Sequence, residues 1–396
     1  MTMTKIPTDR RRPIDRRGFL CAAAAAGVAG LSIPGTPALA DNPAPSDAQP
    51  TTTEAMTENI ERFARRLDLI RQSLDVPGMS VAIVHKQEVV LARGFGLADV
   101  ARGTRATEHT PYPIASLTKT FATAVLMRLV EQGKIELDAP MAAYDPDYAK
   151  WCAGLKGPHG ASWPDFHCDT AQITVRQHLN HTEQGTPGTS FDYSAFLFAR
   201  LTAVIDAVSD KGFLRAVEED ILEPLGMSDT ALGTKDPHKA AVVARMAQAY
   251  LLDRNWNLVD ATSGRSFDRI NASSGIISTV VDLAKYDAAI DRNLVYSAPA
   301  KQQIWTPTAA PSGEKFPYGL GWFVQGEPGA KSQLVWHYGL YPNAFSSLLF
   351  KVPDRQLTLI LLACTERASS VFLLGNGDPV RSAFVTAFLD GFARGV

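Results

Sequence analysis

Ser116 and Lys119, three positions apart, are the residues of this chain whose types and spacing point most directly to chemistry. A serine hydroxyl is a poor nucleophile until a neighbouring group takes its proton. Apolar residues recur at helical spacing from 121 to 130, which predicts a helix that Gly133 ends. Ser116 then lies in the first turn and Lys119 one turn further on, over the same face. The amine could activate the serine, and the helix N-terminus could stabilise an oxyanion.

The Ser-x-x-Lys pattern is not diagnostic by itself. A second copy, Ser312 to Lys315, lies in a loop rich in Pro and Gly, where no helical periodicity aligns its two side chains. A helix-capping serine followed by an exposed lysine is the alternative explanation of Ser116 and Lys119. The rest of the chain has to decide between them.

Residues 1–40 predict an export signal. Basic residues precede an apolar, alanine-rich stretch (19–33) that is short for a membrane span, and Ala38-Leu39-Ala40 offers a small-x-small cleavage site. Arg16-Arg17 resembles the core of a twin-arginine signal, which exports folded proteins. We therefore expect a periplasmic or secreted protein that keeps no stable membrane anchor after signal cleavage.

The charge balance disfavours a nucleic-acid partner. The 41 acidic residues slightly outnumber the 39 basic ones, and no basic run remains beyond the signal. Proteins that bind nucleic acids usually carry a basic patch that neutralises phosphates.

Two of the four cysteines predict a disulfide. Cys152 and Cys168 bracket a loop rich in Gly and Pro, and in an exported protein such a pair is typically oxidised. A metal site with His159 and His167 from the same segment is the alternative, but its spacing matches no standard zinc pattern, so we expect no metal. Cys364 ends an apolar run and is expected to be a buried small hydrophobic residue.

Strand signals occur towards both ends of the chain and helical signals between them. Residues 41–53 read as a flexible linker, followed by one domain over 54–396. Strands are expected at 80–84, 89–94, 322–325, 334–337, 344–351 and 357–364. Helices are expected at 54–73, near 195–207, near 211–222 and from Pro379 onward with Asp378 as N-cap.

This order of elements predicts an α+β fold. An antiparallel sheet would be built from N- and C-terminal segments and flanked by helices, and roughly 138–270 would form a helical second lobe. A cleft between sheet and lobe is the natural place for a site.

Further short segments follow Ser116 in a distinctive order. They are 179–182 (Leu-Asn-His-Thr), 191–194 (Phe-Asp-Tyr-Ser), 224–227 (Pro-Leu-Gly-Met), 274–279 (Ser-Gly-Ile-Ile-Ser-Thr), 318–322 (Tyr-Gly-Leu-Gly-Trp) and 336–339 (Trp-His-Tyr-Gly). Together with Ser-x-x-Lys, and in this order, they resemble the class C β-lactamase and penicillin-binding-protein superfamily of serine hydrolases, including its carboxylesterase branch. The resemblance covers roughly residues 60–390.

This resemblance implies an active site. The nucleophile and lysine of the superfamily match Ser116 and Lys119, and its catalytic tyrosine matches Tyr193. We expect two nearby cations to ease ionisation of Tyr193, so that its phenolate could take the Ser116 proton. His337 could donate a hydrogen bond or, as the second cation, carry charge near neutral pH.

The third motif of the superfamily, usually Lys-Thr-Gly but often His-x-Gly in esterase-like members, matches His337-Tyr338-Gly339. Tyr338 and Gly339 would then contact the substrate. The oxyanion hole would use the backbone N–H groups of Ser116 and Leu340.

Two departures from the superfamily pattern favour ester hydrolysis. Ala195 stands where an asparagine usually binds a substrate amide, and no Lys-Thr-Gly is present to bind a carboxylate. The segment from Thr182 to Tyr193 is also short. The predicted protein is an exported serine hydrolase that forms an acyl-serine intermediate on a small ester or amide, carboxylesterase-like and without a cofactor. A β-lactamase, a D-alanyl or D-amino-acid peptidase, and a catalytically weak homologue that binds cell walls are the alternatives.

Overall fold

A seven-stranded antiparallel sheet is the centre of the computed structural model, which describes residues 52–155, 173–262, 267–327, 329 and 331–393. The strand order is β3-β2-β1-β11-β10-β9-β8. The bounds are β1 Gly78–His85, β2 Glu88–Asp99, β3 Thr104–Arg105, β8 Phe323–Gly326, β9 Gln333–Tyr341, β10 Phe345–Val352 and β11 Leu357–Ala363. Because β1 pairs with β11, segments from the two ends of the chain meet in the middle of the sheet, which confirms the predicted fold class.

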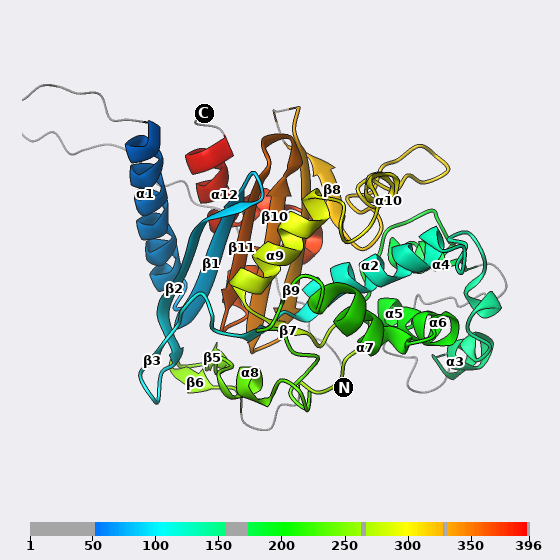
Figure 1. Ribbon diagram of the computed structural model, residues 1–396, viewed down its shortest axis with the longest axis horizontal. Helices are drawn as coiled ribbons and strands as arrows, with labels where there is room; N and C mark the ends of the chain where they lie inside the picture. Colours follow the sequence, from blue (N-terminus) through cyan, green and yellow to red (C-terminus); the bar gives the residue numbers. More distant parts are fainter. Residues whose placement is uncertain (1–51, 156–172, 263–266, 328, 330, 394–396) are drawn as a thin grey trace, which may run out of the picture. The chain divides into compact units, whose positions relative to one another are not determined.

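Both faces of the sheet are covered, as the alternation of side chains along a strand requires. On β1, Val81 and Ile83 pack into one apolar cluster, whereas Ala82 and Val84 pack into the other. Helices α1 (Thr52–Ser73) and α12 (Ala383–Phe388) lie against the first face, and α9 (Val280–Asp291) crosses the second (Figure 1). Because both faces are packed, the sheet can hold side chains at its edge in fixed positions.

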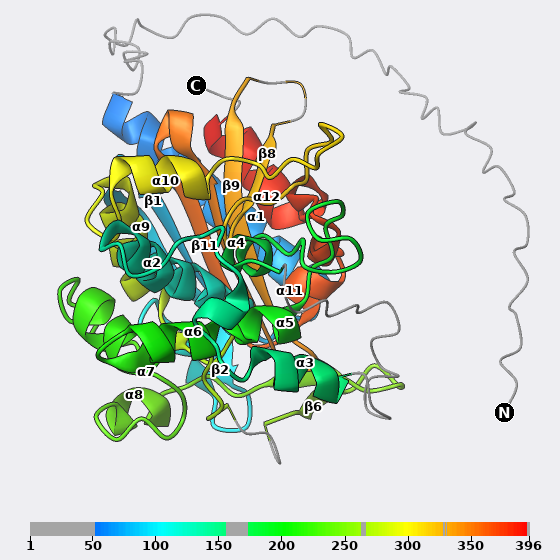
Figure 2. The ribbon, with the colours of Figure 1, turned by 90° about the vertical axis from the view of Figure 1, so that its right-hand side faces the viewer.

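A group of helices lies beyond the β9 and β8 edge of the sheet (Figure 2). Its members are α2 Thr118–Glu131, α3 Tyr148–Leu155, α4 Val175–Leu179, α5 Ala195–Ala199, α6 Leu201–Val208 and α7 Gly212–Val217. The other helices are α8 Ala240–Ala244, α10 Ala298–Ile304 and α11 Arg367–Ser370, and two small strand pairs are β4 Tyr112–Pro113 with β7 Ile277–Ser278 and β5 Tyr250–Leu252 with β6 Leu258–Asp260.

Three helices differ from the sequence-based prediction. The helix predicted over 195–207 is broken at Arg200, whose N–H bonds to Leu197 in a tighter turn and whose guanidinium pairs with Asp145. The helix predicted over 211–222 is α-helical only to Val217 and continues as a π-helical turn.

The last helix begins later than predicted. Residues 379–381 form a separate 3-10 turn, and α12 starts after Ser382, whose hydroxyl accepts the N–H of Val385. Asp378 does not cap a helix because its carboxylate pairs with Arg381.

Several expectations concern segments outside the described residues. These are the signal at 1–40, most of the linker at 41–53, and Cys168, His159 and His167. Within the described part of the chain, no helix has the length and apolar character needed to cross a bilayer.

Candidate active site

Ser116 lies in a 3-10 turn (η1, Ala115–Leu117) between β4 and α2, two residues before the first residue of α2 rather than inside its first turn. The turn is sharp because Ala115 adopts a left-handed conformation with φ of 48°, which is rare for a residue other than glycine. The N–H of Ile114 bonds to the carbonyl of Ile276 at 2.9 Å, so the strand next to α9 fixes the approach to the turn. Such backbone strain is typical of functional sites.

The predicted pairing of Ser116 with Lys119 is present. Lys119 Nζ lies 3.0 Å from Ser116 Oγ and 3.2 Å from the carbonyl oxygen of Ser273. The lysine is fully buried, and burial lowers its pKa well below the ordinary 10.5 because the charged form loses its hydration. A neutral amine at this distance can accept the serine proton.

Tyr193 lies beside this pair, but its electrostatics are opposite to the expectation. Lys119 Nζ is 4.9 Å from the centre of its ring. Burial raises the pKa of Tyr193 well above 10.0, with Tyr338 adding to the rise and Ser116 opposing it. The hydroxyl oxygen is buried and makes no hydrogen bond of normal geometry, although Ser116 is near enough to influence it. The expected phenolate is therefore wrong for the resting site, since a neutral Lys119 supplies no charge to stabilise it.

His337 is also neutral, which corrects the second expectation about charge. It is fully buried, and burial together with nearby Lys119 lowers its pKa to about 3. Its Nδ1 donates to the carbonyl oxygen of Tyr338 at 2.7 Å, so its Nε2 accepts from the hydroxyl of Tyr318 at 2.9 Å. Both nitrogens are occupied by the protein, and His337 holds Tyr318 rather than offering a free donor to a substrate.

Gly339 lies in the part of β9 that extends past its pairing with the edge strand β8, and it joins β9 to the turn that carries Ser116. A Cβ at this position would lie 2.2 Å from the carbonyl oxygen of Ile114, so only glycine permits the contact. Ser347 on the neighbouring strand donates to the same oxygen at 2.6 Å. Leu340 follows directly on β9, and its role in an oxyanion hole stays a prediction.

Tyr338, predicted to bind substrate, is mostly buried. Its ring centre lies 6.1 Å from that of Tyr193, within an aromatic cluster that also contains Phe323. Contact with a substrate at Tyr338 and Gly339 remains a prediction.

Two further polar residues of this region had no role in the sequence analysis. His181 lies in the 179–182 segment and has a left-handed φ of 57°. Its Nδ1 accepts the N–H of Ser194 at 3.3 Å, which places the proton on Nε2, and its ring centre is 4.5 Å from that of Tyr193. Glu183, two residues on, is fully buried. The motif around His181 was a usable signal, whereas no local pattern marks Glu183.

The cysteines follow the expectation as far as the structure describes them. Cys152 is buried in α3 and disulfide-bonded, and its predicted partner Cys168 lies outside the described residues, so the pairing remains a prediction. Cys364 is a free, buried thiol. Among the residues that the structure describes, no cluster of three His, Cys, Asp or Glu side chains could hold a metal ion.

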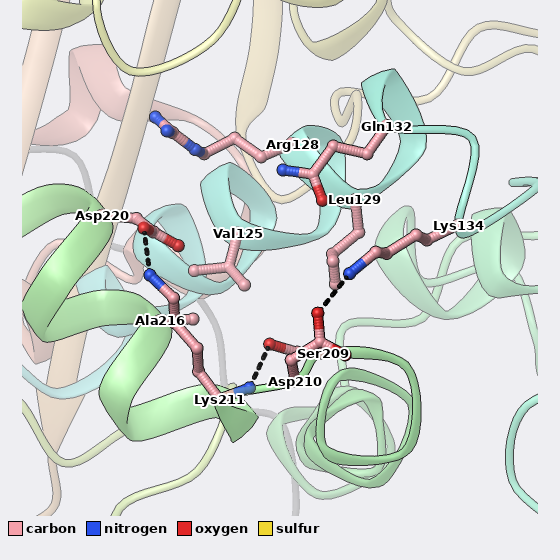
Figure 3. A pocket seen from close by; sticks show the side chains of 10 residues that line it. All are labelled: Val125, Arg128, Leu129, Gln132, Lys134, Ser209, Asp210, Lys211, Ala216 and Asp220. Atoms are coloured by element: carbon pink, nitrogen blue, oxygen red, sulfur yellow. Dashed lines mark hydrogen bonds and ion pairs between the residues drawn. The ribbon is translucent and has the colours of Figure 1, made fainter.

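A pocket of about 190 Å³ lies near the other end of α2, away from Ser116 (Figure 3). Its lysines are paired, because Lys134 pairs with Asp210 and Lys211 pairs with Asp220, and Arg128 donates to the carbonyl of Val295. None of the predicted catalytic residues lines it.

Comparison with known proteins shows which family and which solved structures the chain is similar to. The model of the family described as Beta-lactamase matches residues 66–370. Unguisins hydrolase ungD' from Aspergillus campestris is 25% identical over 76% of this chain and 62% of its own length. Penicillin-binding protein 4* from Bacillus subtilis is 23% identical over 70% of this chain and 66% of its own length. The chain thus spans less than two thirds of these curated relatives.

Two solved structures share the fold. A penicillin-binding protein homologue from Pyrococcus abyssi has a TM-score of 0.66 at 21% identity, over 85% of this chain and 77% of that one. D-amino acid amidase from Ochrobactrum anthropi SV3 has a TM-score of 0.63 at 21% identity, over 84% of this chain and 99% of that one. At this level of identity the likeness concerns the fold alone.

Proposed function

Because the chain belongs to the beta-lactamase family of serine hydrolases, we propose that it hydrolyses small esters or amides through an acyl intermediate on Ser116. The observation that carries the proposal is the contact of 3.0 Å between Nζ of the fully buried Lys119 and Ser116 Oγ. Burial lowers the pKa of the amine and so favours its neutral form, which is the proton acceptor that the serine needs.

The proposed reaction has two halves. In the first, Ser116 Oγ attacks the substrate carbonyl carbon while its proton passes to Lys119. The N–H groups of Ser116 and Leu340 would bind the oxyanion. The lysinium then gives the proton to the leaving alcohol or amine, and the acyl-serine forms. In the second half, a water molecule attacks the acyl-serine and gives its proton to Lys119, which returns it to Ser116 Oγ.

We propose an ester-like substrate over a β-lactam. Ala195 provides no side-chain amide to bind a substrate amide, and His337 is occupied on both nitrogens, so it does not hold a substrate carboxylate. A buried polar group left without a partner costs roughly 1–3 kcal/mol. The names of the relatives and fold neighbours favour the alternatives of β-lactam or D-amino-acid amide hydrolysis. A catalytically weak homologue that binds cell walls is the third possibility.

We also propose that the protein is exported. The support is the basic and apolar pattern of residues 1–40, with Arg16-Arg17 and the small residues at 38–40.

Covalent labelling tests the proposed function. A fluorophosphonate probe is expected to label the wild type and Ser312→Ala equally and to leave Ser116→Ala unlabelled. Ser312 is the matched control because it starts the second Ser-x-x-Lys of the chain and is exposed. Full labelling of Ser116→Ala would end the assignment. The ratio of p-nitrophenyl butyrate to nitrocefin turnover then decides between the enzyme classes, and a kcat/KM for nitrocefin equal to that of the best ester would favour a β-lactamase.

A further inference from the structure

The loop from His181 to Tyr193 holds an unusual number of buried polar atoms without a partner. Among the described residues, these include His181 Nε2, both carboxyl oxygens of Glu183 and the hydroxyl oxygen of Tyr193. Buried polar groups in proteins are nearly always hydrogen-bonded, and an exception calls for an explanation such as an absent ligand. These atoms come from three residues of one short loop beside the catalytic serine, so a ligand is the simplest common explanation.

Glu183 is the least expected of these groups. Its side chain is fully buried, and burial raises the pKa of its carboxyl well above 4.5. Its own N–H is near enough to act on the carboxyl but does not reach hydrogen-bond geometry. Burying a carboxyl group without a partner costs several kcal/mol, and a carboxylate costs more. The residue is therefore not explained by the stability of the fold.

Glu183 and Tyr193 lie on one loop, and hydrogen bonds within that loop hold its two ends together. The N–H of Asp192 bonds to the carbonyl of His181 at 3.0 Å, and the N–H of Gly188 bonds to the carbonyl of Thr182 at 2.8 Å. The side-chain amide of Gln184 donates to the carbonyl of Asp192 at 3.1 Å. These bonds close the loop immediately on both sides of Glu183, so Glu183 belongs to the framework that positions Tyr193.

Among the described residues, the charged group that acts on Glu183 is the carboxylate of Asp192, which raises its pKa further, and no protein cation opposes it. The charge of Glu183 acts in turn on Tyr318, which is held by His337, and on Tyr148, whose hydroxyl bonds to His178 at 2.7 Å. Burial is the main reason that the pKa values of both tyrosines are raised, and negative charge on Glu183 adds to the rise. A cation brought by a ligand would have no protein cation to displace from the carboxyl.

We propose that Glu183 anchors a protonated amino group of the substrate, so that the preferred substrates are amides or esters of amino acids with a free amine. This inference rests on the proposed function of Ser116. An ammonium group has three donors, and opposite charge favours the ionised carboxyl. When the ammonium binds, Glu183 releases its proton to solvent; when the neutral amine binds, the proton moves from Glu183 to the amine. Solvent does not reach the carboxyl in the unliganded structure, so binding includes a movement of its side chain or loop.

Paired substrates test the anchor. We would compare alanine p-nitroanilide, in both enantiomers, with its N-acetyl counterpart and with p-nitrophenyl butyrate, which has no amine. For the wild type, kcat/KM of the preferred free-amine enantiomer is expected to exceed that of its N-acetyl counterpart by tenfold or more. Glu183→Gln keeps the shape without the charge, and it should remove this preference by lowering kcat/KM of the free-amine substrate at least tenfold more than that of its N-acetyl counterpart.

Two controls separate the possible outcomes. Asp192→Asn removes an exposed carboxylate from the same loop, one whose charge raises the pKa of Glu183, and it should keep the preference for the free amine. In the wild type, benzylamine should inhibit butyrate hydrolysis at least tenfold more strongly than benzyl alcohol, a result that does not depend on the folding of any variant. Equal inhibition, no amine preference in the wild type, or equal losses on all substrates in Glu183→Gln would overturn the anchor. Absence of butyrate hydrolysis and of Ser116 labelling would instead overturn the proposed function.

Discussion

At the scale of single residues, the protonation state of Lys119 controls the proposed chemistry. The amine is buried, and within the described part of the chain its hydrogen-bond partners are Ser116 and a backbone carbonyl, while its pKa is lowered well below 10.5. Only the neutral amine accepts a proton, so kcat/KM should rise with pH through the lowered pKa of Lys119 and level off above it. A pH–rate profile with p-nitrophenyl butyrate checks this.

Substitution of Lys119 tests how much this residue contributes to kcat/KM. Lys119→Ala should lower kcat/KM roughly 10³-fold or more, as expected when one member of a cooperating unit is removed. Lys315→Ala, in the second Ser-x-x-Lys, should behave as the wild type. A rate that keeps rising up to the ordinary lysine pKa would contradict a lysine held neutral by burial.

The sequence predicted residue contacts that depend on local spacing, but it did not predict charge states that depend on burial in the fold. The separation of Ser116 and Lys119 follows from helical geometry, and their contact was predictable. The charge states of Tyr193 and His337 were not predictable, because they depend on how deeply strands and loops far apart in the sequence bury them. Glu183 was missed for the same reason.

At the scale of elements, a buried ionic cluster joins helix α9 to the sheet. Lys351 on β10 pairs with Asp287 and, at 3.0 Å, with Asp291, both on α9. The lysine and Asp287 are both fully buried, so removing the lysine leaves an unpaired buried carboxyl group. Lys351→Met should therefore lower the free energy of unfolding by about 3–5 kcal/mol, as measured in urea.

The control for this prediction is an exposed pair. Lys134 and Asp210 lie 2.9 Å apart at the surface, where water and salt screen the charges. Lys134→Met should leave the urea midpoint almost unchanged. A similar small effect for Lys351→Met would mean that the buried cluster does not hold α9 in place.

The elements themselves were predictable to different degrees. The long strands follow alternating or continuous apolar residues, and β10 and β11 lie close to the predicted ranges. Helix breaks were not predictable, because the break at Arg200 coincides with its tertiary ion pair to Asp145 and the late start of α12 depends on a side-chain cap at Ser382. The pairing of β1 with β11 was predictable only as a consequence of strand signals at both ends.

At the scale of the whole molecule, the predicted export of the protein determines whether its cysteines are oxidised. The twin-arginine pattern predicts delivery to an oxidising compartment, where a Gly- and Pro-rich loop between Cys152 and Cys168 would be closed by a disulfide. Cys152, which lies in α3, is buried and disulfide-bonded, whereas Cys364 is a buried free thiol. Thiol titration can therefore report on the location of the protein and on the bridge in one measurement.

We expect one free thiol, that of Cys364, in protein recovered from the periplasm and denatured without reductant. The chain made in a reducing cytosol without residues 1–40 should titrate as three, since it retains Cys152 and Cys168. Cys152→Ser should lower the stability of the oxidised protein by about 3 kcal/mol, because closing a loop of this size restricts the unfolded chain by that amount. It should have little effect on the reduced protein, which lacks the bridge. Three free thiols in the periplasmic protein would rule out the disulfide and return the Cys152 to Cys168 loop, with its two histidines, to the metal-site alternative.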